Sequence, residues 1–284
     1  MIEKPGTLYL CATPIGNLED MTYRGVRVLS EVAVIAAEDT RHTRKLLSHF
    51  DIHTRLISYH EHNKIERGPE IIERLLAGDD VAIVSDAGLP GISDPGSDLV
   101  ALAVQAGITV VPLPGANAAL SALVCSGLDT SLFSFIGFLP KHKKKRRELI
   151  ASLVMSSYTM VFYESPHQIK KTLAELSQAF GERQAVAARE LTKKFEEFIR
   201  GTLESLGQHF SECEPRGEFT LIVAGQSAER AEGVAPSQVP LVDAVMALIE
   251  MGINKKDAIK TIAQERGLPK RDVYQAVLEK SDES

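Results

Sequence analysis

The chain has 284 residues, of which 44% are hydrophobic, so it can bury the cores of about two ordinary domains. Its formal charge of −6 excludes a uniformly basic surface, and any contact with nucleic acid must therefore rest on a local patch. The sequence has no window of about 18 uncharged apolar residues and no signal-peptide core at its start. We therefore expect a soluble, cytoplasmic protein with no membrane partner.

Short β-rich runs alternate with helical patterns in the first part of the chain. The runs cover residues 7–12, 32–37, 56–59, 81–85 and 108–112, and residues 68–76 are one of the helical patterns between them. A second set of runs covers residues 132–137, 158–163, 185–189, 197–200 and 218–224. This alternation predicts two consecutive α/β domains, over residues 1–113 and 114–225.

The end of the chain has a different character. Residues 226–240 have the composition of a linker, without apolar periodicity. Residues 243–251, 256–266 and 270–279 then predict three short helices, separated by Gly252 and Gly267 as candidate helix C-caps. The unit over residues 241–284 resembles a helix-turn-helix, which would contact RNA, but the same pattern is typical of a small structural bundle.

The loop VSDAGLPGISDPG follows the fourth run. Its glycines Gly88, Gly91 and Gly96 do not have the spacing of a dinucleotide-binding loop, and Asp86 and Asp94 would repel phosphate. An acidic, tightly turned backbone favours a ligand that carries positive charge, such as a sulfonium or an amino acid head group. The alternative is a surface turn in which Asp94 caps the following helix.

Two further loops follow strands of the same expected sheet. TPIGNLED contains Pro14, Gly16 and Asn17, and PGANAALSA contains Asn117. Because ligands of open α/β sheets bind outside the carboxyl ends of the strands, these loops could line one crevice. Asn17 could hydrogen-bond a substrate there or only form an Asx-turn.

Two segments are rich in positive charge. AEDTRHTRKLL places Arg41, Arg44 and Lys45 at helical spacing, either as one cationic face or as part of a salt-bridged, solvated helix. FLPKHKKKRRE concentrates six cations in seven positions, namely Lys141, Lys143, Lys144, Lys145, Arg146 and Arg147. A block of one sign gains by neutralising phosphates, so we favour contact with a nucleic-acid backbone over a solvated loop.

Six motifs occur together in a specific order: TPIGNLEDMTYR, AEDTRHTRKLL, SDAGLPGISDPG, GFLPKHKKKRR, YESPH and RELTKKFEE. Together they resemble the bacterial ribosomal small-subunit RNA 2′-O-ribose methyltransferases, which modify a decoding-site cytidine and belong to the tetrapyrrole methylase superfamily. The resemblance extends from residue 1 to about residue 225 and continues into the tail. It implies an α/β fold of two domains with mixed five-stranded sheets, a homodimer, and 16S ribosomal RNA or the small subunit as partner.

The resemblance also implies that S-adenosyl-L-methionine lies between the two domains. Motif positions assign its contacts to Pro14, Asp86, Ala87, Gly88, Ile92, Asn117, Ala118, Tyr163, Glu164, Leu191, Phe219 and Thr220. TPIGNLED stands where the tetrapyrrole relatives have a glycine-rich G-x-G-P-G-D loop. Because this loop borders the acceptor, the departure argues against a corrin or porphyrin substrate.

Transfer of a methyl group to a ribose requires that the 2′-hydroxyl lose its proton, so a positioned base is needed and a metal is not. Glu38 and Asp39 are candidate bases, with Asn17 and Arg41 as orienting groups. We expect Arg41, Arg44 and the basic block to hold RNA phosphates. The alternatives are a small-molecule tetrapyrrole methylase and a non-catalytic RNA-binding ribosome factor.

Overall fold

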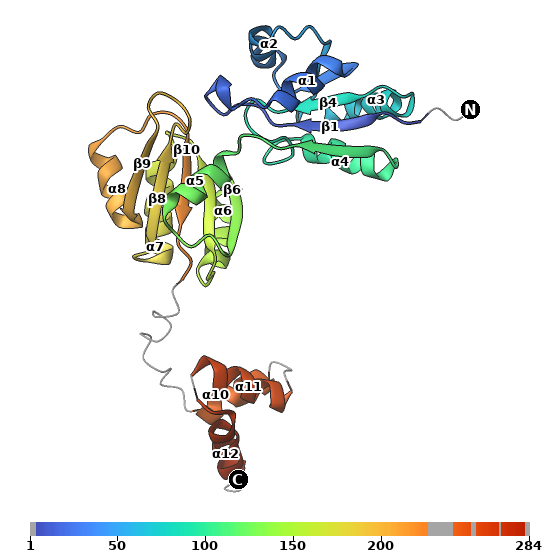
Figure 1. The fold of residues 1–284 in the computed structure, drawn as a ribbon. Helices are drawn as coiled ribbons and strands as arrows, with labels where there is room; N and C mark the ends of the chain where they lie inside the picture. Colours follow the sequence, from blue (N-terminus) through green and yellow to red (C-terminus); the bar gives the residue numbers. More distant parts are fainter. Residues whose placement is uncertain (1–3, 227–240, 251–253, 267, 282–284) are drawn as a thin grey trace. The chain divides into compact units, whose positions relative to one another are not determined.

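A computed structural model describes residues 4–226, 241–250, 254–266 and 268–281. The chain divides into two compact units, Met1–Gln226 and Ser227–Ser284, and the first unit contains two five-stranded sheets (Figure 1). The ten strands match the predicted runs in order. The division of the first unit at residue 113 stays a prediction.

The first sheet has the order β3-β2-β4-β1-β5, and all its pairings are parallel. Its strands are β1 (Thr7–Cys11), β2 (Val34–Ala37), β3 (Leu56–Ser58), β4 (Val81–Val84) and β5 (Thr109–Leu113). The helices α1 (Tyr23–Glu31), α2 (Thr40–His49), α3 (Lys64–Leu76) and α4 (Gly96–Gln105) connect successive strands. The expectation of a mixed sheet is wrong for this sheet. Each helix returns the chain to the end of the sheet where the previous strand began, so all strands run in the same direction.

The central strands of this sheet are buried on both faces, as their unbroken apolar sequences predict. Val34 and Val81 pack on one face against side chains of α3 and α4, including Ile71 and Leu99. The alternate residues of both strands pack on the other face with side chains of α1 and α2, among them Leu29. The sheet is therefore a rigid layer between two layers of helices, and its loops project from its ends.

The second sheet has the order β6-β7-β10-β8-β9 and is mixed, as predicted, with a parallel β6–β7 pair and antiparallel pairs elsewhere. Its strands are β6 (Phe133–Phe138), β7 (Thr159–Glu164), β8 (Gln184–Arg189), β9 (Glu197–Thr202) and β10 (Phe219–Val223). Side chains of α6 (Lys143–Leu153), α7 (Ile169–Phe180) and α8 (Leu203–Glu212) pack in the core on one face. Side chains of α5 (Ala118–Ser126) pack on the other face.

The second unit contains α10 (Leu241–Glu250), α11 (Lys255–Glu265) and α12 (Lys270–Ser281), which correspond to the three predicted helices. They share a small apolar core that includes Val245, Ile259 and Val273. Gly252, Gly267 and residues 227–240 of the predicted linker over residues 226–240 lie outside the described residues. No described helix is long and apolar enough to span a bilayer.

Candidate functional site: a cavity above the first sheet

The loops after β1 and β4 meet at the point in the first sheet where the strand order reverses. β1 and β4 are neighbours, but α1 leads from β1 to β2 on one side and α4 leads from β4 to β5 on the other. Thr13 and Gly88 bridge the two loops through paired backbone hydrogen bonds of 2.9 and 3.0 Å. Such a switch point is where open α/β sheets bind ligands.

A cavity of about 610 Å³ opens at these loops. Its lining includes every residue that the motifs assigned to the cofactor except Pro14, namely Asp86, Ala87, Gly88, Ile92, Asn117, Ala118, Tyr163, Glu164, Leu191, Phe219 and Thr220. Elements of both sheets thus supply one continuous lining, although their cofactor contacts stay predictions. The motifs did not single out other lining residues, including Ile15, Ser85, Leu89, Ser93, Phe138, Ser165, Pro166, Ala188 and Glu218.

Asp94 holds the acidic loop in shape. Its carboxylate accepts hydrogen bonds from the backbone N–H groups of Gly91 at 2.8 Å, Ile92 at 3.3 Å and Gly96 at 2.7 Å. The N-cap position of α4 is occupied by Pro95, without a side-chain cap. Because Gly96 is the first residue of α4, Asp94 does cap this helix as predicted, although from the position before the N-cap. Asp94 also lines the cavity and organises the turn between Gly91 and Gly96.

Three carboxylates share the cavity on the side of the first sheet. Glu38, directly after β2, lines the cavity together with Asp86 and Asp94. Burial, followed by the charges of Asp86 and Asp94, raises the pKa of Glu38 above its ordinary value. Asp86 also accepts a hydrogen bond from the backbone N–H of Asp39 at 2.9 Å, which fixes the acidic loop against the end of β2. The site therefore favours a cation and contains one carboxylate suited to take a proton.

The other predicted catalytic residues do not line the cavity. Asp39 caps α2 and makes an ion pair of 2.8 Å with Arg41, whose side-chain hydrogen bonds hold the pKa of Asp39 well below its usual range. Asn17 accepts a hydrogen bond from the N–H of Glu19 at 3.0 Å and caps a single turn, Leu18–Asp20. Of the four predicted catalytic residues, Glu38 therefore lies at the cavity, whereas Asn17 and Asp39 have local hydrogen-bond partners; the catalytic roles stay predictions.

Aromatic side chains form the cavity wall on the side of the second sheet. Phe138 and Tyr163 both line the cavity, and their ring centroids lie 5.6 Å apart. Phe135 meets Tyr163 edge-on, with ring centroids 5.1 Å apart. Burial raises the pKa of Tyr163 above its ordinary value. This wall offers flat apolar surface to a ligand ring.

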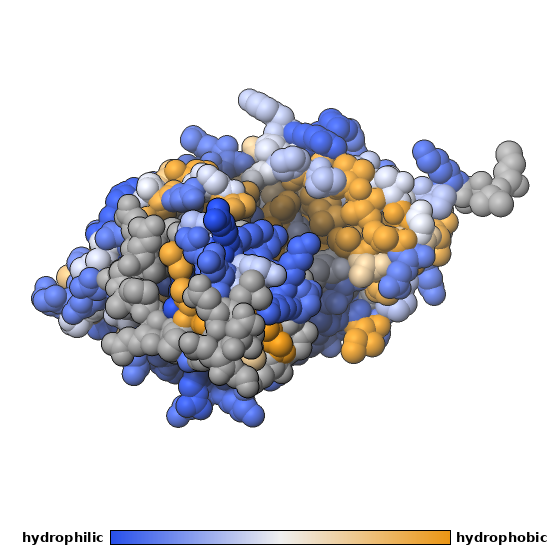
Figure 2. All heavy atoms as spheres, turned by 90° about the horizontal axis from the view of Figure 1, so that it is seen from below, coloured by the Kyte–Doolittle hydropathy of each residue, from blue (hydrophilic) through white to orange (hydrophobic). Residues whose placement is uncertain are grey.

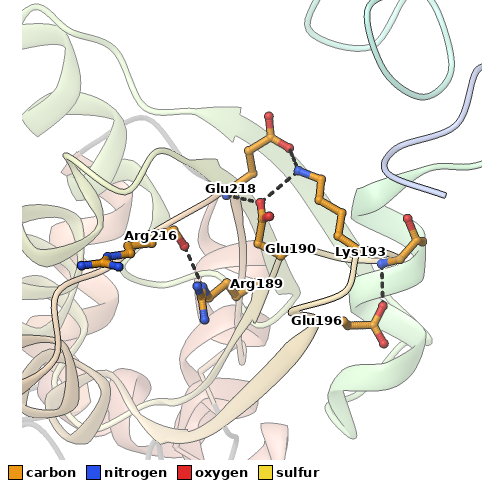
Figure 3. Close-up of polar contacts among 7 residues, drawn as sticks. Arg189, Glu190, Lys193, Glu196, Arg216 and Glu218 are labelled. Carbon is orange, nitrogen blue, oxygen red and sulfur yellow. Dashed lines mark hydrogen bonds and ion pairs between the residues drawn. The ribbon is translucent and has the colours of Figure 1, made fainter. Parts of the chain in front are cut away.

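A polar cluster beside β8 and β10 includes Glu218 of the lining (Figure 3). The ammonium group of Lys193 lies 2.9 Å from the carboxylate of Glu190 and 2.8 Å from that of Glu218. Glu190 and Thr192 have φ angles of 50° and 66°, in the left-handed region that non-glycine residues rarely adopt. Strain of this kind persists where surrounding contacts fix the backbone, and the ion pairs of Lys193 and the hydrogen bond from the N–H of Thr192 to Glu196 are such contacts.

Gly16 provides the close approach between this loop and the loop after β1. A Cβ atom on Gly16 would lie 2.3 Å from Cγ of Lys193, 2.9 Å from the hydroxyl of Thr192 and 3.1 Å from the carbonyl oxygen of Leu191. We expect Gly16→Ala to reduce the free energy of unfolding by about 1–3 kcal/mol through overpacking. We also expect it to weaken ligand binding, because Leu191 lines the cavity.

Denaturant unfolding and calorimetric titration with S-adenosylhomocysteine would measure both effects. Gly207→Ala is the matched control, because Gly207 lies in α8 with no neighbour within 4 Å. This control should increase stability by about 0.5–1 kcal/mol. Equal changes in stability and in ligand affinity in the two variants would contradict the close packing of the two loops at Gly16.

The basic block begins just before α6 and forms its first turns. Lys141, Lys143, Lys144, Lys145 and Arg147 are exposed, whereas only 6% of Arg146 is accessible. The guanidinium group of Arg146 donates to Glu175 at 2.5 Å and to the hydroxyl of Thr172 at 2.7 Å. The prediction that Arg146 binds RNA is therefore corrected, since its donors are directed inward to protein acceptors.

α2 carries a second cationic surface. Thr43, Leu46 and Leu47 are buried, while Arg41 and Arg44 are exposed, as their helical spacing predicts. The side chain of Arg41 is 86% exposed even though it is paired with Asp39. Contact of these two arginines with RNA stays a prediction. Within the residues that the structure describes, no group of His, Cys, Asp and Glu could hold a metal ion.

Comparison with known proteins agrees with this architecture. Residues 7–207 match the family Tetrapyrrole (Corrin/Porphyrin) Methylases. Ribosomal RNA small subunit methyltransferase I of Halalkalibacterium halodurans is 52% identical over 95% of this chain and 93% of that protein, and the protein of the same name from Synechocystis sp. is 48% identical over 96% and 98%. A structure of uroporphyrin-III C-methyltransferase from Thermus thermophilus, complexed with S-adenosylhomocysteine, superimposes with a TM-score of 0.55 at 18% identity, over 77% of this chain and 97% of that one, which shows the shared fold. The chain therefore belongs to the tetrapyrrole (corrin/porphyrin) methylases and, within them, to the family of ribosomal RNA small subunit methyltransferase I.

Proposed function

We propose that this protein transfers a methyl group from S-adenosyl-L-methionine to the ribose 2′-hydroxyl of a decoding-site cytidine in 16S ribosomal RNA. Methyl transfer that uses S-adenosylmethionine, with small-subunit ribosomal RNA as substrate, follows from the family. The choice of ribose and of cytidine is our proposal. The observation that carries it is the presence, in one compact unit, of an acidic cavity and a cationic surface on α6. A single tetrapyrrole substrate would not need so many cationic side chains spread over the surface.

The cavity fits the methyl donor. Its volume of about 610 Å³ is in the range of sites for small molecules. Asp86 and Asp94 supply negative charge for a sulfonium and an ammonium group, and Phe138 and Tyr163 supply apolar surface for a purine ring. S-adenosylmethionine, when bound, supplies a methyl group activated by the positive sulfur.

Glu38 is the residue that we propose as proton acceptor for the ribose hydroxyl. Its raised pKa improves it as a base relative to an ordinary carboxylate, and it lines the same cavity as the proposed donor site. Asp39 is a poorer base because it is bound to Arg41. The remaining task of the site is to hold the hydroxyl in line, for which the closely packed loops at Gly16 and Leu191 provide a frame.

RNA is proposed to lie against Lys141, Lys143, Lys144, Lys145 and Arg147. The first turn of α6 contains three of these lysines and has no side-chain cap. Positive charge at a helix N-terminus opposes the helix dipole, so this arrangement costs stability unless an anion approaches. Arg41 and Arg44 on α2 and the three-helix unit α10–α12 are further proposed contacts.

We also propose a homodimer in the cytoplasm. Apolar residues gather in patches on the face drawn in Figure 2. Among the described residues, the exposed large apolar side chains include Leu120 and Val124 on α5 and Phe133 on the edge strand β6. Surfaces of this kind often mark protein contacts. Val124→Glu should therefore shift the protein toward monomer in sedimentation equilibrium. Met155→Glu, a change of another exposed apolar side chain, is the control and should not.

Labelled S-adenosylmethionine provides the direct test of the function. The protein would be incubated separately with small subunits, with naked 16S RNA and with a tetrapyrrole, and labelled RNA would be digested to nucleosides. Label on the ribose of one cytidine is the expected result. Label on a base, transfer only to the tetrapyrrole, or binding of RNA without any transfer would each overturn the proposal.

A further inference from the structure

One member of the basic block is connected to the cavity by a chain of hydrogen bonds. Arg146 donates from its guanidinium group to the hydroxyl of Thr172 at 2.7 Å, and this hydroxyl donates in turn to the carboxylate of Glu164. Arg146 also forms an ion pair of 2.5 Å with Glu175. Glu164 lines the cavity at the end of β7, whereas Arg146 and Thr172 lie on α6 and α7.

Glu164 needs such a connection because it is buried. Only 6% of its surface is accessible, and among the described residues no lysine, arginine or histidine forms a direct ion pair with it. One carboxylate oxygen accepts the backbone N–H of Ser165 at 2.9 Å, and the other accepts the hydroxyl of Thr172. A buried carboxylate with two neutral donors is costly unless positive charge lies close by, and the guanidinium group of Arg146 supplies that charge through Thr172.

The geometry points to Arg146 and Thr172 as positioning residues that hold Glu164 in the cavity for its ligand. The carboxylate of Glu164 has lone pairs beyond the two that its protein partners occupy, so it can accept from hydroxyl or amino groups of a bound ligand. Thr172 fixes the direction in which the carboxylate points, and Arg146 fixes the hydroxyl of Thr172 as a donor by occupying its acceptor position. This inference rests on the proposed function only in taking the cavity as the site of S-adenosylmethionine.

The fold gives Arg146 a different environment from its neighbours in the basic block. Lys145 and Arg147 are exposed, whereas Arg146 points from the same helix into the protein and is paired there. Arginine suits this place because its fork of donors bonds Glu175 and Thr172 at once, which a lysine does not reproduce. The basic block thus combines two roles, a surface for anions and one buried cation that acts on the cavity.

The decisive variant is Thr172→Val, which removes the hydroxyl and keeps the shape of the side chain. We expect the dissociation constant of S-adenosylhomocysteine, measured by calorimetric titration without RNA, to rise about tenfold, as for loss of a buried hydrogen bond to a charged group. Thr172→Ser should restore binding to within about twofold, because the hydroxyl returns. In turnover, Thr172→Val should raise KM for S-adenosylmethionine and leave KM for RNA unchanged.

Thr159→Val is the matched control. Thr159 is a buried threonine at the other end of β7, and its hydroxyl donates to the backbone carbonyl of Asp129. This variant carries the general cost of a lost buried hydroxyl without touching Glu164. Thermal unfolding of all variants separates loss of fold from loss of binding. A further variant, Arg146→Lys, keeps the positive charge but removes the guanidinium group that bonds Glu175 and Thr172 at once.

The outcomes separate the alternatives. Unchanged ligand affinity in both Thr172→Val and Arg146→Lys would overturn the inference, and so would equal weakening by Thr159→Val and Thr172→Val. If Arg146→Lys reduced only RNA affinity, Arg146 would be an RNA contact instead. Because the titration contains no RNA, its result is independent of whether methyl transfer to a ribose is observed.

Discussion

Glu38→Gln should lower the rate of methyl transfer by about 100- to 10,000-fold, the usual contribution of a general base. The substitution keeps the size of the side chain and removes the proton acceptor from the cavity. Single-turnover transfer of labelled methyl to RNA measures the rate, and calorimetric titration with S-adenosylhomocysteine shows whether the cavity still binds its ligand. Asp39→Asn is the comparison variant, since Asp39 does not line the cavity; a larger loss there would assign the base to Asp39.

The pH dependence gives the same prediction a second readout. Because the pKa of Glu38 is raised, its protonated, inactive fraction extends to higher pH than for an ordinary glutamate. The single-turnover rate should therefore fall as the pH drops through this raised pKa, and Glu38→Gln should lack that limb. A wild-type profile with no acidic limb, or a limb that survives in Glu38→Gln, would argue against Glu38 as the base.

The contribution of Glu38 to folding stability should become more favourable as the pH falls, whereas the rate of methyl transfer falls. A carboxyl group whose pKa is raised on folding binds its proton more tightly in the folded state, so its contribution favours folding below the unfolded pKa and is lost as the pH rises through the folded pKa. At neutral pH the ionised Glu38 beside Asp86 and Asp94 therefore disfavours folding. Glu38→Gln should melt at a higher temperature than the wild type at pH 7, and the difference should shrink toward acidic pH.

The second large effect concerns RNA. Replacing Lys143, Lys144 and Lys145 by alanine should weaken binding of 16S RNA and make its salt dependence shallower. Each phosphate contact that is lost reduces the slope of log K against log salt by about 0.7–0.9, so three contacts amount to about 2–3. Filter binding or fluorescence anisotropy at several salt concentrations measures both quantities. Titration with S-adenosylhomocysteine should be unchanged, because none of the three lysines lines the cavity.

A variant of equal charge change controls for the overall field of the protein. Arg27 is exposed and pairs with Glu31 on α1, whereas Arg67 and Arg74 are partly exposed and pair with Glu70 on α3 and with Asp79. Replacing these three by alanine removes the same number of cations at low cost in stability. If this control reduced the salt slope as much as the lysine variant, the RNA surface on α6 would be refuted.

Much of the site follows from chain order. Loops after β1 and β4 must meet at one edge of a parallel sheet. The motifs named lining residues from both sheets, but they did not single out others, such as Glu218 and Phe138. Glu218 immediately precedes β10 and Phe138 ends β6, and a strand-end position of this kind is the signal that could have found them.

Other features depend on side-chain partners that a sequence does not specify. Asn17 and Asp39 carry suitable chemistry, but their oxygens are occupied by local caps and by Arg41. Arg146 looks identical to its neighbours in the sequence, and only the packing of α6 against α7 decides that it is buried beside Glu175 and Thr172. Similarly, the direction of every strand in the first sheet depends on how its helices return the chain.

The grouping of Glu38, Asp86 and Asp94 in one cavity has a consequence for turnover. These carboxylates attract a sulfonium, and they lose that attraction when methyl transfer leaves a neutral thioether. The cavity should therefore bind the charged donor more tightly than the neutral thioether product. The product can then dissociate and be replaced by donor even when both are present. At equal concentrations the charged donor should therefore occupy the cavity in preference to the neutral thioether.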